Sequence, residues 1–135
     1  MIRRYKSTDA APLAELFYGK AAGGIDLGAW HRSFASNTSF VAELDGRLVG
    51  FADLDISSFC TACTSGYVNR VYVTPELRRN GIGRALVSAL EKYAAENKVG
   101  VLSAEAVREA LPFFEALNYS IVREDSENYL VRKMI

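Results

Sequence analysis

The stretch from Tyr67 to Tyr93 constrains the fold more than any other part of this sequence. It begins with YVNRVYV, a Val- and Tyr-rich segment that is typical of a β-strand. A glycine-containing segment, RRNGIGR at 78–84, comes next, and apolar residues then recur at spacings of three and four as far as Tyr93. This spacing predicts a helix with one buried face over Gly81–Asn97. A strand that passes through a glycine loop into a helix indicates an α/β fold.

The remaining segments extend this pattern. Asp45-Gly46 separates two predicted strands, Phe40–Leu44 and Arg47–Ile56, and predicts a type I′ hairpin, because that turn needs positive φ at both central residues. Apolar spacing and turn residues predict further helices at 7–21, 27–35 and 105–118, and further strands at 1–5, 99–104, 119–125 and 128–135. The predicted order is β-α-α-β-β-β-α-β-α-β-β, an α/β domain over residues 1–135 with a mixed, mostly antiparallel central sheet.

Charge and hydropathy exclude several classes of protein. Lys plus Arg and Asp plus Glu number 16 each, so the chain lacks the basic footprint of a nucleic-acid or anionic-membrane binder. No apolar run approaches the roughly 20 residues of a membrane span. The N-terminus, MIRRYKSTDA, lacks the apolar stretch of a signal peptide. We therefore expect a cytoplasmic protein with no nucleic-acid or membrane partner.

Cys60 and Cys63 form an isolated C-x-x-C pair within a Ser/Thr-rich segment. A structural zinc site needs four ligands, and the single histidine, His31, is distant in sequence. We expect no metal site, and two free thiols in a connection between strands.

The glycine segment has the composition of an anion site. The first turn of a helix has unpaired N–H groups and a partial positive charge. Gly81 and Gly83 leave these groups accessible, and Arg78, Arg79 and Arg84 add charge around them. A phosphate or diphosphate is the expected ligand. The alternative is a glycine-eased helix start with incidental surface arginines.

Two nucleotide-binding motifs do not match this segment. A Walker P-loop requires Lys followed by Ser or Thr after its last glycine, where this chain has Arg84-Ala85. A Rossmann turn requires a third glycine, and Leu86 occupies that position. A nucleotide-binding module is therefore disfavoured.

The segment V-x-V-x-P-x-x-R-R-N-G-I-G-R-A-L, from Val71 to Leu86, resembles the acyl-CoA-binding motif of the GNAT superfamily of N-acetyltransferases. That motif, [Q/R]-x-x-G-x-[G/A] after a strand, is matched by Arg78, Gly81 and Gly83. A second segment, A-x-x-F-F-E-x-x-x-Y at 110–119, is similar to the family's A-x-x-F-Y-E-x-x-G-F. The resemblance covers nearly the whole chain. It implies acetyl-CoA as cosubstrate and a splay between the fourth and fifth strands, by position Tyr67–Val73 and Val99–Ala104.

In such a protein, an amine attacks acetyl-CoA directly and no acyl-enzyme forms. The resemblance implies that the main chain of Val71 and Val73 pairs with the pantetheine arm, and that the N–H of Val71 faces the thioester oxygen. It implies that the N–H groups of Arg79 to Arg84 bind the diphosphate. The cofactor-binding residues expected on this basis are Val71, Tyr72, Val73, Arg78, Arg79, Asn80, Gly81, Ile82, Gly83 and Arg84.

The catalytic residues are less fully specified by the resemblance. Glu105, after the fifth strand, is the expected general base, and its alternative role is to cap the next helix. Tyr67 and Asn69 alternate with Val68 and are expected either in the cleft or simply on a half-polar sheet face.

The family's usual acid, a tyrosine, is replaced here by Phe114, and Val107 stands where many members have a CoA-binding asparagine. Tyr119 is the substitute candidate for the acid, although a tyrosine at its position commonly packs in the core. These departures keep a second function open, an acyl-CoA-binding sensor or interaction domain without turnover.

Trp30 and Phe34 are the expected substrate-binding residues, with core packing as the alternative. The acceptor is expected to be a small-molecule or peptide amine, whose identity no charge pattern reveals. A homodimer is compatible with the resemblance.

Overall fold

The computed structural model describes residues 1–58 and 64–135, and Cys60 and Cys63 lie outside these ranges. The predicted order of helices and strands is confirmed. In these ranges, no helix is long and apolar enough to cross a membrane. The strands are β1 (Ile2–Arg4), β2 (Thr38–Leu44), β3 (Arg47–Ser58), β4 (Thr64–Val73), β5 (Val101–Val107), β6 (Ser120–Glu124) and β7 (Asn128–Met134). The α-helices are α1 (Ala10–Tyr18), α2 (Leu27–Ala35), α3 (Ile82–Glu96) and α4 (Leu111–Ala116), and the 3₁₀ turns are η1 (Ser7–Asp9), η2 (Gly19–Gly24), η3 (Pro75–Leu77) and η4 (Arg108–Ala110).

The strands form a mixed sheet in the order β1-β2-β3-β4-β5-β7-β6. The pairs β1–β2, β2–β3, β5–β7 and β6–β7 are antiparallel, and β4–β5 is parallel. The parallel ladder runs only from Ser65–Val101 to Tyr67–Ser103, although β4 continues to Val73 and β5 to Val107. The predicted mostly antiparallel sheet with a splay between its fourth and fifth strands is therefore confirmed.

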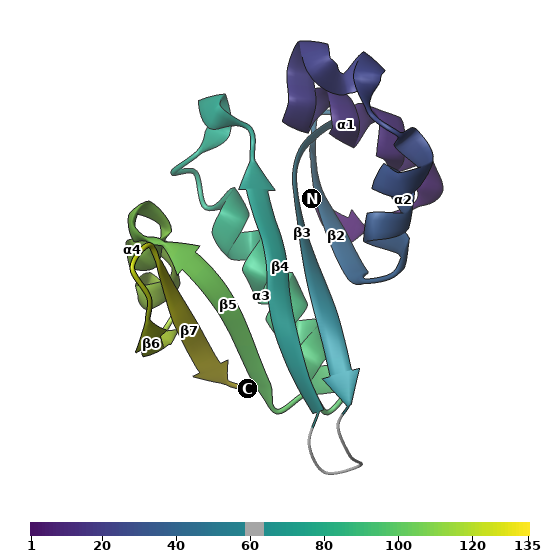
Figure 1. Ribbon diagram of the computed structural model, residues 1–135. Helices are drawn as coiled ribbons and strands as arrows, with labels where there is room; N and C mark the ends of the chain where they lie inside the picture. The colour runs from purple at the N-terminus through teal and green to yellow at the C-terminus, as the bar shows by residue number, and fades with distance from the viewer. Residues whose placement is uncertain (59–63) are drawn as a thin grey trace. The chain divides into compact units, whose positions relative to one another are not determined.

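The chain separates into two compact units, and β3, β4 and α3 each contribute residues to both. The first unit comprises Met1–Leu54 and Arg70–Leu90. Its core is built from apolar faces of α1, α2, β2 and β3, where Leu13, Trp30, Phe34 and Phe51 are buried. Figure 1 shows α1 and α2 next to each other, with α2 beside β2.

Local sequence explains the turns of the first unit. Asp45 and Gly46 have φ values of 52° and 77°, as the predicted type I′ hairpin requires. The carboxylate of Asp26 accepts a hydrogen bond from the Ala29 N–H at 3.1 Å and so caps α2. Asp9 is buried at the end of η1, where it accepts hydrogen bonds from the Arg3 guanidinium at 2.9 Å.

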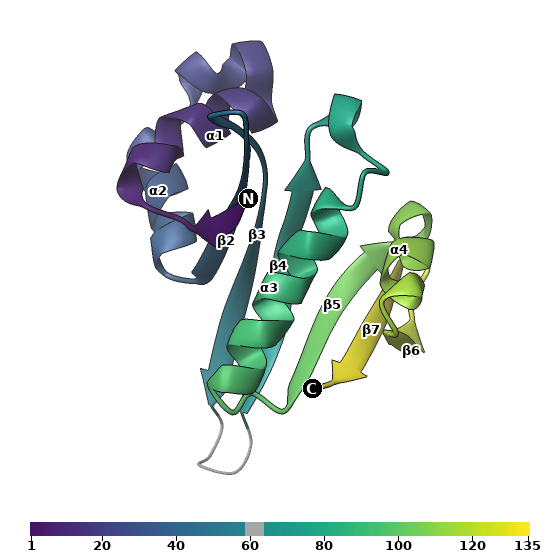
Figure 2. The ribbon, with the colours of Figure 1, turned by 180° about the vertical axis from the view of Figure 1, so that it is seen from behind.

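The second unit comprises Asp55–Asn69 and Glu91–Ile135. Along β5 the buried residues Leu102, Ala104 and Ala106 alternate with more exposed ones, as expected for a strand with one covered face. Seen from behind, α4 lies beside β5 and the β6–β7 hairpin (Figure 2). Asn118 has a φ of 71° and ends this helical segment in the left-handed conformation, which asparagine tolerates.

The predicted boundary between the fifth strand and the helix after it is wrong. The helix expected from residue 105 begins only with η4 at Arg108, because β5 continues through Val107. The cause is the antiparallel ladder with β7, which pairs Glu105 with Leu130 and Val107 with Asn128. Tertiary pairing thus overrides the helical character of the sequence EAVREAL.

Candidate functional site

The glycine segment of the first unit forms a tight turn between β4 and α3. After η3, Arg79 and Gly81 adopt left-handed φ values of 67° and 80°. The Asn80 side chain donates a hydrogen bond to the Leu77 carbonyl at 3.2 Å and closes the turn. A Cβ at Gly81 would meet no atom within 4 Å, so glycine is favoured here by backbone conformation, and the space beside it is open.

This turn leaves a run of main-chain donors unpaired. The first hydrogen bond of α3 runs from the Ala85 N–H to the Gly81 carbonyl at 3.0 Å. Within residues 1–58 and 64–135, no group accepts a hydrogen bond from the N–H of any residue from Arg79 to Arg84. These donors lie at the positive end of a 15-residue helix. Their chemistry fits a diphosphate, and its binding at these residues stays a prediction.

The three arginines around the turn differ in what they contact. The Arg78 Nε donates to the Val73 carbonyl at 2.9 Å, and its guanidinium lies 5.5 Å from the centre of the Tyr72 ring. Arg78 therefore ties the turn to the end of β4. Arg79 and Arg84 are exposed, and they supply the positive charge that a bound anion would meet.

The end of β4 is held closely against β3. The Thr74 N–H donates to the Val49 carbonyl at 2.8 Å. A Cβ at Gly50 would lie 2.5 Å from the Tyr72 carbonyl oxygen and 3.3 Å from the Val73 Cα, so only glycine fits there. No local pattern in the sequence marks Gly50, because the need for glycine there comes from a contact with β4, a strand distant in sequence. Binding of pantetheine by the main chain of Val71 and Val73 stays a prediction.

In the second unit, Glu105 is an exposed residue of β5. The alternative role of capping a helix is wrong for Glu105, because the residue lies within the strand and the helical turn starts at Arg108. Burial raises the pKa of Tyr67, the Glu105 carboxylate raises it further, and a hydrogen bond with the Glu105 main chain opposes the increase. Tyr67 and Glu105 are thus neighbours. Asn69 is exposed on β4.

Tyr119 does not have the environment of a general acid. The residue is buried against Phe114, with ring centres 5.4 Å apart, and its hydroxyl donates to Glu91 Oε2 at 2.9 Å. Burial, together with the charge and hydrogen bond of Glu91, raises the pKa of Tyr119 far above its ordinary value. Lys133 completes the cluster with an ion pair to Glu91 at 3.1 Å. Tyr119 therefore packs in the core, which was the alternative to a role as the general acid, and we do not retain it as the acid.

The two predicted substrate-binding residues have different environments. Phe34 is 1% exposed, inside the aromatic core of the first unit, so core packing describes it. Trp30 is also largely buried and donates its indole N–H to the Ala10 carbonyl at 3.0 Å, but one part of its ring lines a cavity. His31 is half-buried, with Nδ1 2.8 Å from the Tyr5 hydroxyl.

An ion pair in the first unit was missed by the sequence analysis. Asp53 is completely buried, and Arg70 Nη2 lies 2.7 Å from its Oδ2. The Asn37 amide also donates to this carboxylate, at 3.2 Å. The available signal was a carboxylate between the apolar residues Ala52 and Leu54 within a predicted strand, since a buried carboxylate needs a partner.

Comparison with known proteins gives consistent results. A family model, the acetyltransferase (GNAT) family, matches residues 9–119. An aminoglycoside N(6')-acetyltransferase type 1 of Klebsiella aerogenes is 43% identical over 53 residues, which cover 37% of this chain and 35% of that protein. The uncharacterized N-acetyltransferase YafP of Escherichia coli (strain K12) is 30% identical over 100 residues, covering 74% of this chain and 57% of that protein. The matches thus span about a third to three fifths of these relatives' lengths.

The fold is also found in solved structures. The PaiA N-acetyltransferase of Thermoplasma acidophilum, crystallised in complex with coenzyme A, superposes with a TM-score of 0.78 at 19% identity, over 100% of this chain and 98% of that one. At this identity the likeness establishes the fold alone. Taken with the family model over most of the sequence, it leads to one conclusion: the chain belongs to the GNAT acetyltransferase family.

Proposed function

We propose that this chain transfers the acetyl group of acetyl-CoA to a primary amine by direct attack, without an acyl-enzyme. The observation that carries the proposal is the run of unpaired N–H groups from Arg79 to Arg84, at the start of α3 in a GNAT family member. Two further findings support it: a relative is named as an aminoglycoside acetyltransferase, and a structural neighbour was crystallised with coenzyme A.

The first unit supplies the groups proposed to bind acetyl-CoA. The N–H groups of Arg79 to Arg84 bind the diphosphate, and the Arg79 and Arg84 side chains add charge. Arg78 keeps the turn attached to Val73. The main chain of Val71 and Val73 pairs with the pantetheine arm, and the Val71 N–H stabilises negative charge that develops on the thioester oxygen. Bound acetyl-CoA supplies an acetyl group already activated as a thioester.

The second unit supplies the proposed base. An alkylamine with a pKa of about 10.4 costs roughly 4 to 5 kcal/mol to deprotonate at pH 7, so a proton acceptor matters more than a proton donor. Glu105, exposed on β5 beside Tyr67, takes the proton from the amine, directly or through water. The neutral amine nitrogen then forms a bond to the acetyl carbon, the carbon–sulfur bond breaks, and the thiolate leaves. The second proton that the nitrogen loses passes to the thiolate or to water, which leaves a neutral amide. With a pKa near 8.5, the thiol costs only about 2 kcal/mol to release as thiolate at pH 7.

A second function is favoured by the side chains at positions 114 and 119, where a proton donor is expected. Phe114 has no hydroxyl, and the Tyr119 hydroxyl is engaged by Glu91. A domain that binds acyl-CoA without turnover would have these features. Thiol release from acetyl-CoA over a panel of amines separates the two functions: binding of CoA without release for any amine supports the sensor.

The diphosphate site is tested with two matched glycine variants. Gly81 and Gly46 both have positive φ, 80° and 77°, and a Cβ at either would meet no atom within 4 Å. Each glycine-to-alanine change therefore costs a similar stability, about 1 to 2 kcal/mol. By calorimetry, Gly81→Ala should weaken CoA binding at least about tenfold, because its methyl group occupies the approach to the N–H groups, whereas Gly46→Ala should not. Equal CoA affinities for the two variants would contradict the proposed site.

A further inference from the structure

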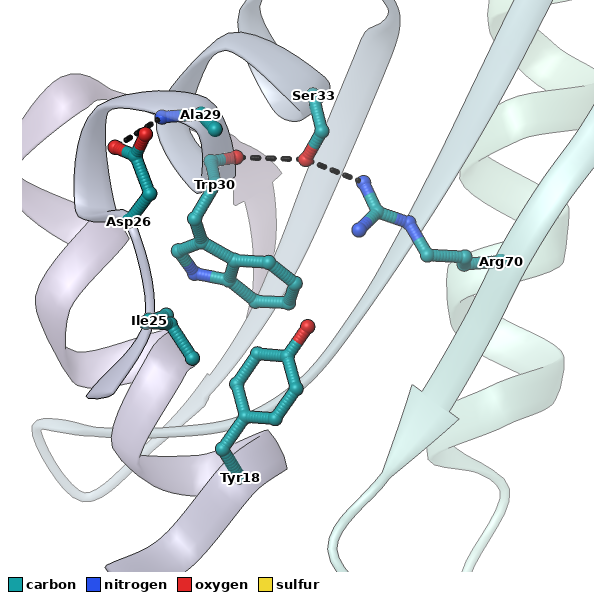
Figure 3. A pocket seen from close by; sticks show the side chains of 7 residues that line it. All are labelled: Tyr18, Ile25, Asp26, Ala29, Trp30, Ser33 and Arg70. Atoms are coloured by element: carbon teal, nitrogen blue, oxygen red, sulfur yellow. Dashed lines mark hydrogen bonds between the residues drawn. The ribbon is translucent and has the colours of Figure 1, made fainter. Parts of the chain in front are cut away.

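A cavity in the first unit is not used by the proposed chemistry. It has a volume of about 370 Å³, at the lower end of the range for small-molecule pockets of about 300 to 1,000 Å³. Figure 3 shows the side chains of α2 and the preceding turn on one side and Arg70 of β4 on the other. The lining residues are Tyr18, Ile25, Asp26, Ala29, Trp30, Ser33 and Arg70.

Arg70 is held in one orientation by its neighbours. Its Nε lies 3.2 Å from both carboxylate oxygens of Asp53, and its Nη2 donates to Asp53 at 2.7 Å and to the Ser33 hydroxyl at 3.3 Å. The guanidinium carbon lies 4.3 Å from the centre of the Phe34 ring and 5.3 Å from that of Trp30. A guanidinium fixed by an ion pair and by aromatic faces loses little entropy when it binds a ligand.

One end of this guanidinium makes no hydrogen bond to the part of the chain that the structure describes. Among residues 1–58 and 64–135, none accepts a hydrogen bond from Arg70 Nη1. In Figure 3 one terminal nitrogen is bonded to Ser33, and the other lies on the side of the Trp30 ring. Two N–H donors are therefore available to a ligand in the cavity.

The charges around the cavity determine which kind of ligand oxygen these N–H donors bind best. The positive charge of Arg70 is already balanced by the buried Asp53 carboxylate. Asp26 adds a second carboxylate to the cavity wall. A ligand carboxylate would meet one cation and two anions, whereas a neutral carbonyl oxygen accepts the hydrogen bonds without added repulsion.

We infer that this cavity binds the acetyl acceptor, and that the acceptor is an amine with an adjacent amide carbonyl, as in an amino-acid amide or a peptide N-terminus. Arg70 Nη1 donates to the carbonyl oxygen, and the apolar part of the acceptor packs against Trp30 and Tyr18. This inference rests on the proposed acetyl transfer for the identity of the ligand as acceptor. It assigns Arg70 as a residue that determines specificity.

Three probes with a common skeleton test the preference. Phenylalaninamide has the amide carbonyl, phenethylamine lacks it, and phenylalanine replaces it with a carboxylate. Trp30 is the only tryptophan of the chain, so its fluorescence reports ligand entry without any need for turnover. We expect phenylalaninamide to reach half-saturation at a concentration at least about tenfold lower than either other probe.

Variants of two arginines make the test specific. Arg70→Lys keeps a cation for the buried Asp53, and therefore the fold, but loses the two Nη1 donors. It should reduce the preference for phenylalaninamide over phenethylamine to less than about threefold. Arg32→Lys is the matched control, since Arg32 is an exposed residue of α2 outside the cavity lining, and it should keep the full preference.

The outcomes distinguish this inference from the proposed function. Equal half-saturation for phenylalaninamide and phenethylamine, tighter binding of phenylalanine, or an unchanged preference in Arg70→Lys would overturn the inference. Any of these results is compatible with acetylation of other amines. Conversely, the expected binding preference, together with no thiol release from acetyl-CoA for these probes or for any amine of the panel, would contradict the proposed transfer, while the cavity's preference for an amide carbonyl would stand.

Discussion

Gly50 links the packing of the sheet to the proposed acetyl-CoA site, and its replacement by alanine tests that link. A Cβ at this position would lie 2.5 Å from the Tyr72 carbonyl oxygen. In proteins, the distance from a Cβ to such a neighbouring atom is essentially never under 3.0 Å. The atom in the way belongs to the main chain, so no side-chain rotation relieves the clash. One strand must move by about half an ångström, and such overpacking typically costs about 1 to 3 kcal/mol.

The same displacement should weaken CoA binding. Tyr72 lies between Val71 and Val73, whose main chain is proposed to bind the pantetheine arm. Each main-chain hydrogen bond contributes about 0.5 to 1.5 kcal/mol, so the misalignment of two should weaken CoA binding by about tenfold. Gly50→Ala is therefore expected to lower both the free energy of unfolding, measured in urea, and the CoA affinity, measured by calorimetry.

Gly46→Ala is the control, four residues away at the β2–β3 turn. Its added methyl group meets no atom within 4 Å, and its cost of about 1 to 2 kcal/mol arises only from positive φ. This variant should lose comparable stability but keep the CoA affinity of the unmodified chain. The reasoning is refuted if Gly50→Ala unfolds within about 0.5 kcal/mol of the unmodified chain, or binds CoA as tightly as Gly46→Ala.

Three further predictions concern charged and polar side chains. Burial alone would raise the pKa of Asp9, but hydrogen bonds from Arg3 and from a backbone N–H outweigh it and hold the pKa below its ordinary value, about 3.9. The resulting stability is present above about pH 4 and is lost as pH falls through the lowered pKa. Asp9→Asn should lower the free energy of unfolding by about 2 to 3 kcal/mol at pH 7, and should flatten the decline of that free energy at acidic pH, as measured by urea titrations. A decline at acidic pH that Asp9→Asn leaves unchanged would contradict this role of Asp9. Tyr119→Phe should lower the free energy of unfolding by about 1 kcal/mol but leave kcat within about twofold, whereas a hundredfold loss of kcat would restore this residue as the acid. Glu105→Gln should flatten the rise of turnover with increasing pH. Glu109 is an exposed residue four positions away, and Glu109→Gln should keep this rise. A pH profile of turnover that Glu105→Gln leaves unchanged would exclude Glu105 as the base.

Much of the fold was predictable because its signals are local. The Asp45-Gly46 turn, the spacing of Trp30 and Phe34 on α2, and the left-handed Asn118 all depend on residues within one or two turns of chain. The start of α3 was equally accessible, since its glycines and arginines are contiguous. The site features in that segment follow from helix-terminus chemistry that any strand–loop–helix unit shares.

The features that escaped prediction depend on contacts between distant segments. Gly50 is required by the Tyr72 carbonyl, and Arg70 is positioned by Asp53, residues that are 17 or more positions apart in sequence. Pairing with β7 extends β5 past Glu105, against the helical tendency of that segment. The order of elements was therefore predictable, but the partners that fix individual side chains were not.

The central claim is that the unpaired N–H groups at the start of α3 bind the diphosphate of coenzyme A. Amide resonances of Arg79 to Arg84 in ¹⁵N–¹H spectra, recorded during titration with CoA and separately with pantetheine, which lacks the diphosphate, test it most directly. The account predicts large, saturable shifts of these amides with CoA and little change with pantetheine. Absence of shifts in this segment with CoA, or equal shifts with both ligands, would contradict it.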